Sequence, residues 1–484
     1  MAASSQGTRS IVGGLVWLHR WTGLLVCLFF ALWFASGAVM LFEPFPSLPA
    51  GERLSRGEQL DPATIAVSPV EALSARPEAD SLQVRARDGQ PVYVLGRDGQ
   101  APTVVDARSG GVLGKIDGEA AGRIAEKFSG MMPLRIDANV EHDQWIVHEG
   151  FDAGRPYHRV AMDDLAGTVL YVSAWTGEVR QRTTRTQRAL NSVGAVPHWL
   201  YWTAIRQHWS FWDSLVWWVS LGALGSALLG FILGIYRYVQ SRARGGSGWR
   251  VYVSWWRWHH VLGLTAGVFL LGWILSGWLS MDHGRLFSRG APSDSAMTAM
   301  RGMPLSATVG RVSLQSFAAA GPVAAIQWRA VAGNAFLEVV RRDGAEVVTR
   351  GAAPQKTLPD DWLLAGLRRA FPDAGTIVEQ KVGASALYPR AEELPVGARL
   401  YLVGATDPHH VYVYATTGEI LVDMDVSRRA YAWVYYALHT YKVPALAGRD
   451  SLRITLMLLL LAGGLSLSVT GVVIAYRRLR ATIA

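Results

Sequence analysis

The stretch LHRWTGLLVCLFFALWFASG at residues 18–37 returns later in the chain as WHHVLGLTAGVFLLGWILSG at residues 258–277. Identical residues recur 240 positions apart, and the matching pairs are His19 and His259, Gly23 and Gly263, Leu24 and Leu264, Phe29 and Phe269, Trp33 and Trp273, Ser36 and Ser276, and Gly37 and Gly277. Both copies are long apolar segments with a histidine near one end. A histidine within or beside a membrane segment costs free energy, which by itself suggests a function. Two such histidines at matching positions predict that they act together.

The composition is typical of a membrane protein. Half of the 484 residues are hydrophobic, and the chain contains 20 tryptophans. Four stretches carry no charged residue and exceed the length of about 20 residues that a bilayer crossing requires. They are residues 21–42, 214–236, 261–281 and 454–476. The first apolar run is too long for a secretory signal, and its twin lies far from the N-terminus, so both are interpreted as membrane helices.

The placement of charge predicts how the chain crosses the membrane. The net charge is +9, and the segments before Trp21, from 237 to 258 and after Tyr476 contain arginines but no acidic residue. The positive-inside rule places these three segments in the cytoplasm. We therefore expect a four-pass protein of the bacterial inner membrane with cytoplasmic termini and two long periplasmic connections. Since the arginines are restricted to the membrane flanks, the predicted partner is the lipid bilayer and not nucleic acid.

Each long connection is of single-domain size. In each, a strand–turn–strand pattern (91–107 and 335–350) precedes a helical pattern (118–128 and 359–371) and further alternating strands. This order predicts two small α+β units, each with a helix against an antiparallel sheet. The predicted division is a tail and first membrane helix at 1–43, a periplasmic domain at 44–212, a second helix at 213–237, a basic loop at 238–257, a third helix at 258–281, a second periplasmic domain at 282–450, and a fourth helix with a basic tail at 451–484.

A second set of matches extends the repeat over the whole chain. Thr176-Gly177-Glu178 recurs as Thr417-Gly418-Glu419 at a spacing of 241, and a histidine follows each glycine by 21 residues, His198 and His439. Repetition at a fixed spacing indicates repeated structural units. The chain is therefore interpreted as two copies of a helix, an outer domain and a helix.

The order of these motifs resembles the PepSY-associated transmembrane family of bacterial iron-uptake proteins. The motifs are LHRWTGL at 18–24, a strand ending in TGE, a histidine before the second helix, WHHVLGL at 258–264, and LHTY at 438–441. Each motif is short, but their order and double occurrence are specific, and the resemblance covers almost the whole chain. It implies a four-helix membrane core with PepSY-like periplasmic domains. It also implies a reductase that uses two haem b groups to reduce iron bound to siderophores.

Four histidines are the predicted haem ligands. A haem held by two histidines needs two neutral imidazoles on opposite sides of the porphyrin, and facing helices of a bundle can supply them. His19 and His259 are predicted to form a pair near the cytoplasmic face, and His198 and His439 a pair near the outer face. The glycines at i+4 after the first pair, Gly23 and Gly263, leave room for a ring on the same helix face. The single cysteine lies outside any CxxCH motif, so both b-type haems would be non-covalent.

Other roles for these histidines remain open. A single histidine at a helix end is commonly an interfacial, hydrogen-bonded residue. His260 is an alternative to His259, although a helix turns it roughly 100° away. His198 stands 16 residues before the charge-free run of the second helix, which departs from the family pattern, so the closer His208 is an alternative ligand there.

Further polar clusters suggest an accessory iron or substrate site. The segment EHDQWIVHEGFD at 141–152 offers His142, His148 and Glu149, a mixture of nitrogen and oxygen ligands that suits a hard or borderline metal. The remaining candidate ligands are His283, His409 and His410. Alternatively, residues 141–152, His283, and His409 with His410 are simply solvated polar side chains in loops.

The sequence therefore predicts an oxidoreductase that passes electrons from the cytoplasmic side to ferric iron, its substrate, in the periplasm. No nucleotide-binding motif is visible, so the electron donor is expected to be another protein, a diffusible reduced flavin or a quinol. One alternative is a periplasmic sensor or docking protein that is merely anchored by four helices. Another is an iron or haem permease, although four helices offer no obvious polar path.

Overall fold

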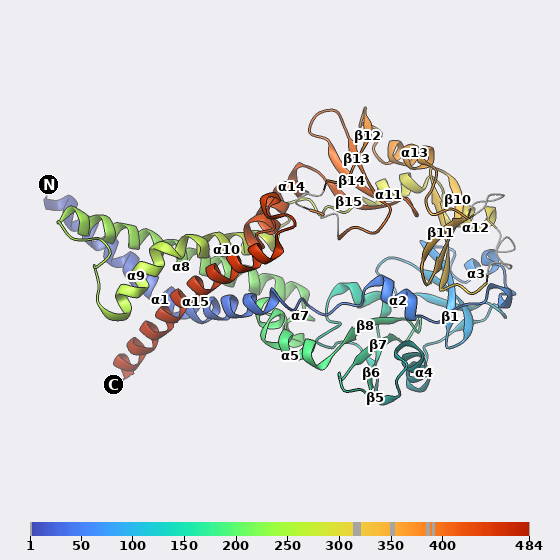
Figure 1. The fold of residues 1–484 in the computed structure, drawn as a ribbon, viewed down its shortest axis with the longest axis horizontal. Helices are drawn as coiled ribbons and strands as arrows, with labels where there is room; N and C mark the ends of the chain where they lie inside the picture. Colours follow the sequence, from blue (N-terminus) through green and yellow to red (C-terminus); the bar gives the residue numbers. More distant parts are fainter. Residues whose placement is uncertain (1, 313–320, 349–353, 384–387, 390–392, 484) are drawn as a thin grey trace.

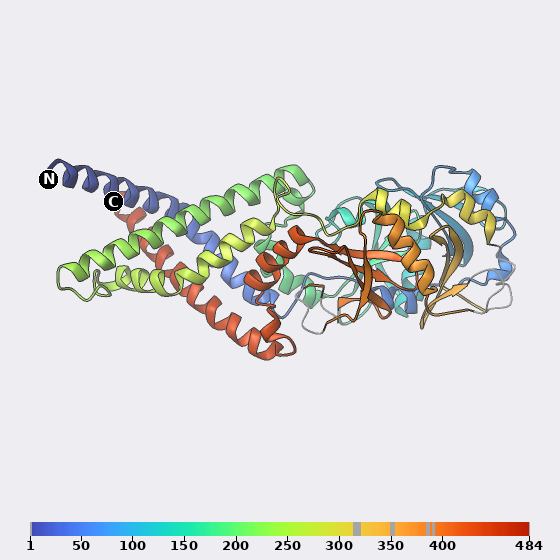
Figure 2. The ribbon, with the colours of Figure 1, turned by 90° about the horizontal axis from the view of Figure 1, so that it is seen from above.

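The computed structural model describes residues 2–312, 321–348, 354–383, 388–389 and 393–483. The molecule is elongated, with long helices at one end and the β-sheets at the other (Figure 1; Figure 2). Both chain termini lie at the end of the helices that is remote from the sheets. We call this the terminal end of the helix bundle, and we call the opposite end the sheet end.

Long apolar helices form the bundle. They are α1 (Ala2–Met40), α8 (Trp209–Ala243), α9 (Ser254–Thr265), α10 (Gly267–Ser280) and α15 (Asp450–Ile483). Helix α1 packs against both α8 and α15, while α9 packs against α15 and α10 against α8. Phe34 and Trp273 belong to the buried apolar core of the bundle, with their ring centroids 5.7 Å apart. This apolar core lies between the two ends of the bundle.

Helices α9 and α10 meet at an angle of 61°, so the helix predicted at 258–281 is bent. Glycines flank the bend at Gly263 and Gly267, and glycine lowers helix propensity. The described part of the chain thus contains three helices long and apolar enough to cross a membrane, and a fourth if the bent pair forms one span. The prediction of several membrane helices is confirmed.

The two outer segments contain short helices and antiparallel strands. The first holds α2 (Ala50–Arg56), η1 (Pro62–Thr64), α3 (Pro69–Ser74), β1 (Ser81–Arg87), β2 (Gln90–Gly96), β3 (Thr103–Asp106), β4 (Val112–Leu113), α4 (Gly118–Ser129), β5 (Pro133–Val140), η2 (Glu149–Gly154), β6 (Tyr157–Met162), β7 (Val169–Ser173), β8 (Val179–Thr183), α5 (Arg185–Val193), α6 (Ala195–His198) and α7 (Thr203–Arg206). The second holds α11 (Asp294–Arg301), α12 (Leu305–Arg311), β9 (Ala325–Val331), β10 (Asn334–Arg341), β11 (Gly344–Val348), α13 (Asp360–Ala370), β12 (Ile377–Gln380), β13 (Ala398–Val403), β14 (His409–Tyr414), β15 (Glu419–Met424), α14 (Val426–Ala432), η5 (Trp433–His439) and η6 (Pro444–Leu446).

Some strands of the two segments combine in a shared sheet, which differs from the prediction of two separate α+β units. Strands β1–β4 and β9–β11 form a seven-stranded sheet in the order β11-β10-β9-β1-β2-β3-β4. Its central junction is antiparallel, and Gln83 of β1 pairs with Gln327 of β9. Leu82 and Ile326 belong to the same buried core. Each hairpin thereby covers a strand edge that the other would leave unpaired.

Two four-stranded sheets complete the outer part, in the orders β5-β6-β7-β8 and β12-β13-β14-β15. Helix α4 shares a buried core with the first of these sheets and α13 with the second. The two TGE turns pack closely against strands β1 and β9 of the seven-stranded sheet. Gly177 and Gly418 have φ angles of 67° and 73°, and a Cβ atom there would collide with Arg87 and Val331 respectively. Only glycine fits this close approach without strain.

Candidate functional site

The four histidines singled out by the repeat lie in two pairs inside the helix bundle. His198, the last residue of α6, faces His439, the last residue of the π-helix η5, with ring centroids 6.4 Å apart. We call this the sheet-side pair. His19 of α1 faces His259 of α9, also with ring centroids 6.4 Å apart, and we call this the terminal pair.

Hydrogen bonds fix the orientation of the sheet-side pair. The Nδ1 atom of His198 lies 3.1 Å from Ser36 Oγ, and Nδ1 of His439 lies 3.1 Å from Ser276 Oγ. Each serine hydroxyl donates its only proton to a helix carbonyl one turn earlier, at Leu32 O and Trp273 O. The hydroxyl oxygen is therefore left to accept a hydrogen bond from the imidazole N–H. Both rings carry their proton on Nδ1, which leaves Nε2 with a free lone pair.

The terminal pair reaches the same state by different contacts. The Nδ1 atom of His19 lies 3.1 Å from the carbonyl oxygen of Ser226, which can only accept a hydrogen bond. The Nδ1 atom of His259 lies 2.9 Å from Thr470 Oγ1, whose own proton is donated to Leu467 O. Both imidazoles therefore donate through Nδ1. A hydrogen bond from the second ring nitrogen is the usual arrangement of a histidine that ligates a metal through the first.

The spacing of both pairs fits a metal ion between the rings. A ligating imidazole nitrogen lies about 2.0 Å from its metal, so two rings on opposite sides have centres roughly 6 Å apart. The observed 6.4 Å agrees with this in both pairs. Ser36 follows His19 by 17 residues in the same helix, a rise of about 25 Å. The two pairs therefore lie near opposite ends of the bundle.

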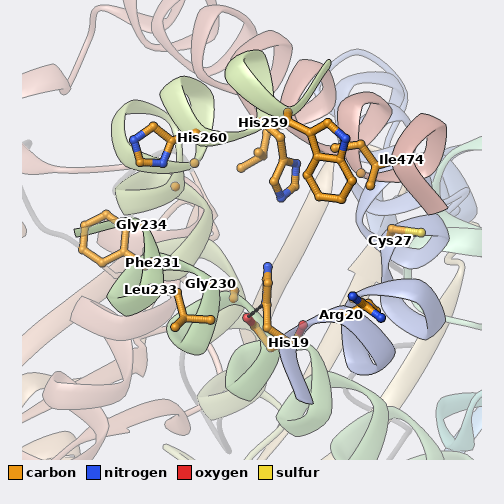
Figure 3. A pocket seen from close by; sticks show the side chains of 18 of the residues that line it. His19, Arg20, Cys27, Gly230, Phe231, Leu233, Gly234, His259, His260 and Ile474 are labelled. Carbon is orange, nitrogen blue, oxygen red and sulfur yellow. Dashed lines mark hydrogen bonds between the residues drawn. The ribbon is translucent and has the colours of Figure 1, made fainter. Parts of the chain in front are cut away.

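A cavity of about 260 Å³ adjoins the terminal pair. Figure 3 shows His19 and His259 on facing helices with open space between them. Gly23 and Gly263 line this cavity, and an added Cβ atom at either would meet its nearest neighbour only at 3.9 or 4.0 Å. The room that the i+4 glycines were expected to leave is present beside both histidines.

Other glycines approach the histidines more closely, and the sequence reasoning missed them. A Cβ atom on Gly230 of α8 would collide with the ring of His19, and one on Gly471 of α15 would lie 3.7 Å from His259 Cε1. These two glycines stand 241 positions apart, so the repeat contained the signal. At the sheet end, a Cβ atom on Gly37 or Gly277 would lie 3.4 or 3.3 Å from the ring of its neighbouring histidine.

The alternative ligands lie elsewhere. His260 is buried, and its Nε2 atom lies 3.0 Å from the carbonyl oxygen of Gly248, so it ties α9 to the loop before it. Figure 3 places it beside His259 on the same helix. His208 is exposed just before α8, where its Nε2 atom lies 3.4 Å from the side chain of Gln207. His198, and not His208, is the residue that faces His439.

The predicted accessory metal site is not formed among the described residues, where no three His, Cys, Asp or Glu side chains are close enough to hold a metal ion. Local partners occupy the proposed ligands. His148 Nδ1 accepts a hydrogen bond from the backbone of Gly150, and burial lowers the pKa of its imidazole below the ordinary value. Glu149 pairs with Arg206 at 2.6 Å, while His142 is exposed.

The remaining candidates are also engaged or isolated. His283 Nδ1 lies 2.5 Å from Asp213 Oδ2, which joins the loop after α10 to the start of α8. His409 Nδ1 lies 2.9 Å from Asp423 Oδ1 on the neighbouring strand. His410 pairs in register with Leu402 and Met424 within its sheet. These contacts stabilise the fold and leave no cluster of free ligands.

The apolar helices and antiparallel sheets define a membrane-associated protein with a large extramembrane part. Residues 16–478 match the family model described as the PepSY-associated TM region, and the chain belongs to this family. A search of curated proteins found no match.

Proposed function

We propose that the protein is an inner-membrane reductase with two non-covalent b-type haems, one in each histidine pair. In this proposal the chain forms a duplicated four-span bundle with its termini in the cytoplasm and PepSY-like domains in the periplasm. Electrons would enter from a cytoplasmic or quinol donor near the terminal pair. They would leave near the sheet-side pair to reduce ferric iron, which we expect to arrive as a siderophore complex.

The observation that carries this proposal is the hydrogen bond through Nδ1 that all four paired histidines make, which assigns the same tautomer to each. Each imidazole donates through Nδ1, so each Nε2 lone pair is available to a metal in the gap between two rings. His283 and His409 also make hydrogen bonds through Nδ1, but these four histidines differ in facing one another in pairs, with ring centroids 6.4 Å apart. The family match is compatible with it, because the matched residues 16–478 include all four histidines.

A haem held by two imidazoles carries one electron at a time on its iron. The chain's own residues would do the rest. Ser36 and Ser276 would hold the sheet-side imidazoles against rotation, and the buried Phe34 and Trp273 would exclude water from the space between the two sites. Ferric iron that accepts the electron becomes a softer, less charged ion. Hard oxygen ligands bind that ion more weakly, so iron would be released.

A pyridine haemochrome spectrum of the purified protein tests this function. We expect about two haems b per chain, a spectrum that dithionite reduces, and reoxidation by a ferric siderophore. Protein that is purified from haem-replete cells and contains no haem would contradict the proposal. It would favour the alternative of a periplasmic sensor or docking protein.

A further inference from the structure

Two arginines stand at equal distances beyond the glycines of the terminal pair. Arg237 follows Gly230 in α8 by seven residues, and Arg478 follows Gly471 in α15 by seven residues. Seven residues are about two helical turns, so each arginine lies on the same helix face as its glycine. Both arginines line the cavity beside His19 and His259.

The guanidinium of Arg237 is incompletely satisfied. Its Nε atom is buried and has no hydrogen-bond partner among the described residues, and Nη1 makes only a 3.4 Å contact with Gln240. A buried donor without a partner costs free energy, so such a group usually indicates a missing acceptor. The ring of Tyr236 lies 6.0 Å away, and its hydroxyl oxygen accepts a hydrogen bond from Gln240 Nε2 at 3.1 Å.

The surroundings are rich in positive charge. The loop from 237 to 258 and the tail from 477 to 484 contain no acidic residue, and Arg20 also lines the cavity. None of the described acidic side chains lines the cavity to balance this charge, so an anion from outside the chain would satisfy Arg237. A guanidinium binds a carboxylate or a phosphate with two parallel hydrogen bonds, which suits this position.

We propose that Arg237, together with Arg478 on the facing helix, binds the carboxylates of the planar group held between His19 and His259. This inference rests on the proposed function and adds an orientation to it. Arg237 and Arg478 would hold the two propionate carboxylates of a haem at the terminal end of the bundle. Cys27 and Phe30, which also line the cavity, would contact its apolar edge.

A comparison of the binding affinities of haem b and its dimethyl ester tests whether Arg237 binds the carboxylates. Esterification removes the carboxylate charges and leaves the macrocycle unchanged. The full chain is produced without haem in a His439→Ala background, so that only the terminal site can bind. Without the substitution at Arg237, we expect haem b to bind at least about tenfold more tightly than the ester. In Arg237→Gln, haem b should weaken toward the affinity of the ester, while binding of the ester stays unchanged.

Arg242→Gln is the matched control, since Arg242 lies on the same helix but does not line the cavity. It should keep the preference for haem b. Arg237→Lys, which retains the charge but not the planar fork, should give an intermediate preference and guards against a failure of the glutamine variant to fold. If Arg237→Gln discriminates between the two porphyrins as strongly as the unsubstituted site, the inference is overturned. If neither porphyrin binds to the unsubstituted site, the proposed function fails instead.

A lipid phosphate is the other source of the same anion chemistry. The titrations are therefore repeated in nanodiscs of zwitterionic and of anionic phospholipid. Carboxylate binding predicts the same loss of discrimination in both lipids. A loss that occurs only in zwitterionic lipid, and is restored by anionic lipid, would assign Arg237 to the headgroup and overturn the inference.

Discussion

The terminal and sheet-side pairs share one geometry but are supported differently. The ring centroids are 6.4 Å apart in both. At the sheet end, two serines at matching positions of the repeat hold the two imidazoles by equal 3.1 Å contacts. At the terminal end, a backbone carbonyl holds His19 and a threonine hydroxyl holds His259. The pair spacing and the hydrogen bond through Nδ1 are common to both ends, whereas the groups that accept these hydrogen bonds differ.

Removal of a ligand gives the largest expected effect. His19→Ala should empty the terminal pair and His439→Ala the sheet-side pair, so that each variant falls from about two haems per chain to about one. The haem-to-protein ratio from pyridine haemochrome spectra measures this. Loss of both haems in either single variant would show that the two pairs do not bind independently.

Substitutions of two glycines beside the terminal pair test two different effects. Gly230 contacts the predicted haem ligand His19, whereas Gly23 lines the cavity predicted to hold the haem. Gly230→Ala should displace the His19 ring, because the new methyl group collides with it, and should abolish binding at the terminal pair. Gly23→Ala should weaken binding less, since its methyl group takes up part of the cavity but meets Ser226 Oγ only at 3.9 Å. Absorption spectra of both purified variants check the difference. Equal loss in both would mean that the macrocycle itself lies against Gly23.

The supports of the histidines should give smaller effects that differ between the ends. Ser36→Ala and Ser276→Ala should weaken haem binding at the sheet-side pair by similar factors, about 10- to 100-fold. Thr470→Val should do the same for His259, whereas no side-chain substitution can remove the carbonyl that holds His19. Titration of the haem-free variants with haem measures these factors. Clearly unequal effects of the two serine substitutions would contradict the matched geometry.

The smallest expected effect concerns Glu178, in the part of the chain that carries the β-sheets. It is a dependence of folding stability on pH. Burial opposes the ionisation of Glu178, but Arg85, Arg180 and Arg53 outweigh it and hold its pKa below the ordinary value. The ionised carboxylate therefore stabilises the folded state above about pH 4.3, and this stabilisation is lost as the pH falls through the folded pKa. Glu178→Gln should lower the unfolding temperature near neutral pH and differ less from wild type in acid.

Thermal unfolding followed by circular dichroism, at neutral and acidic pH, measures this difference. Glu419→Gln is the matched control from the second half. Its nearest arginine contact, to Arg329, is 3.9 Å long, and its side chain is 55% exposed, so its effect should be smaller. A larger effect for Glu419 than for Glu178 would contradict this account.

The sequence was sufficient to predict the features of the structure that depend on a local pattern of residues. Long apolar runs predicted the membrane helices, and the repeat of His19 at His259 and of His198 at His439 selected residues that the structure places side by side. The predicted family is confirmed. The glycines at 230 and 471 were missed because the repeat was followed from the first and third helices and not from the second and fourth.

The features that could not be predicted from the sequence depend on contacts between residues far apart in the chain or on competing side-chain partners. The pairing of β1 with β9 joins residues more than 240 positions apart, and alternating apolar residues do not specify the partner strand. The residues of the predicted accessory metal site do not form a cluster of three ligands among the described residues, and His148 and Glu149 instead contact Gly150 and Arg206. The sequence showed the ligand types but not these competing partners.

The junction of β1 and β9 determines what would happen if the chain were cut in two. A chain that ended after α8 would expose β1 as an edge strand with unpaired N–H and C=O groups, which invites aggregation. Two copies of that chain could cover the edge by pairing β1 with β1 about a twofold axis, as homodimers do. The meeting of Gln83 with Gln327 is thus a dimer-like interface contained within one polypeptide. A half-length chain should be recovered as a dimer or an aggregate, and not as a monomer.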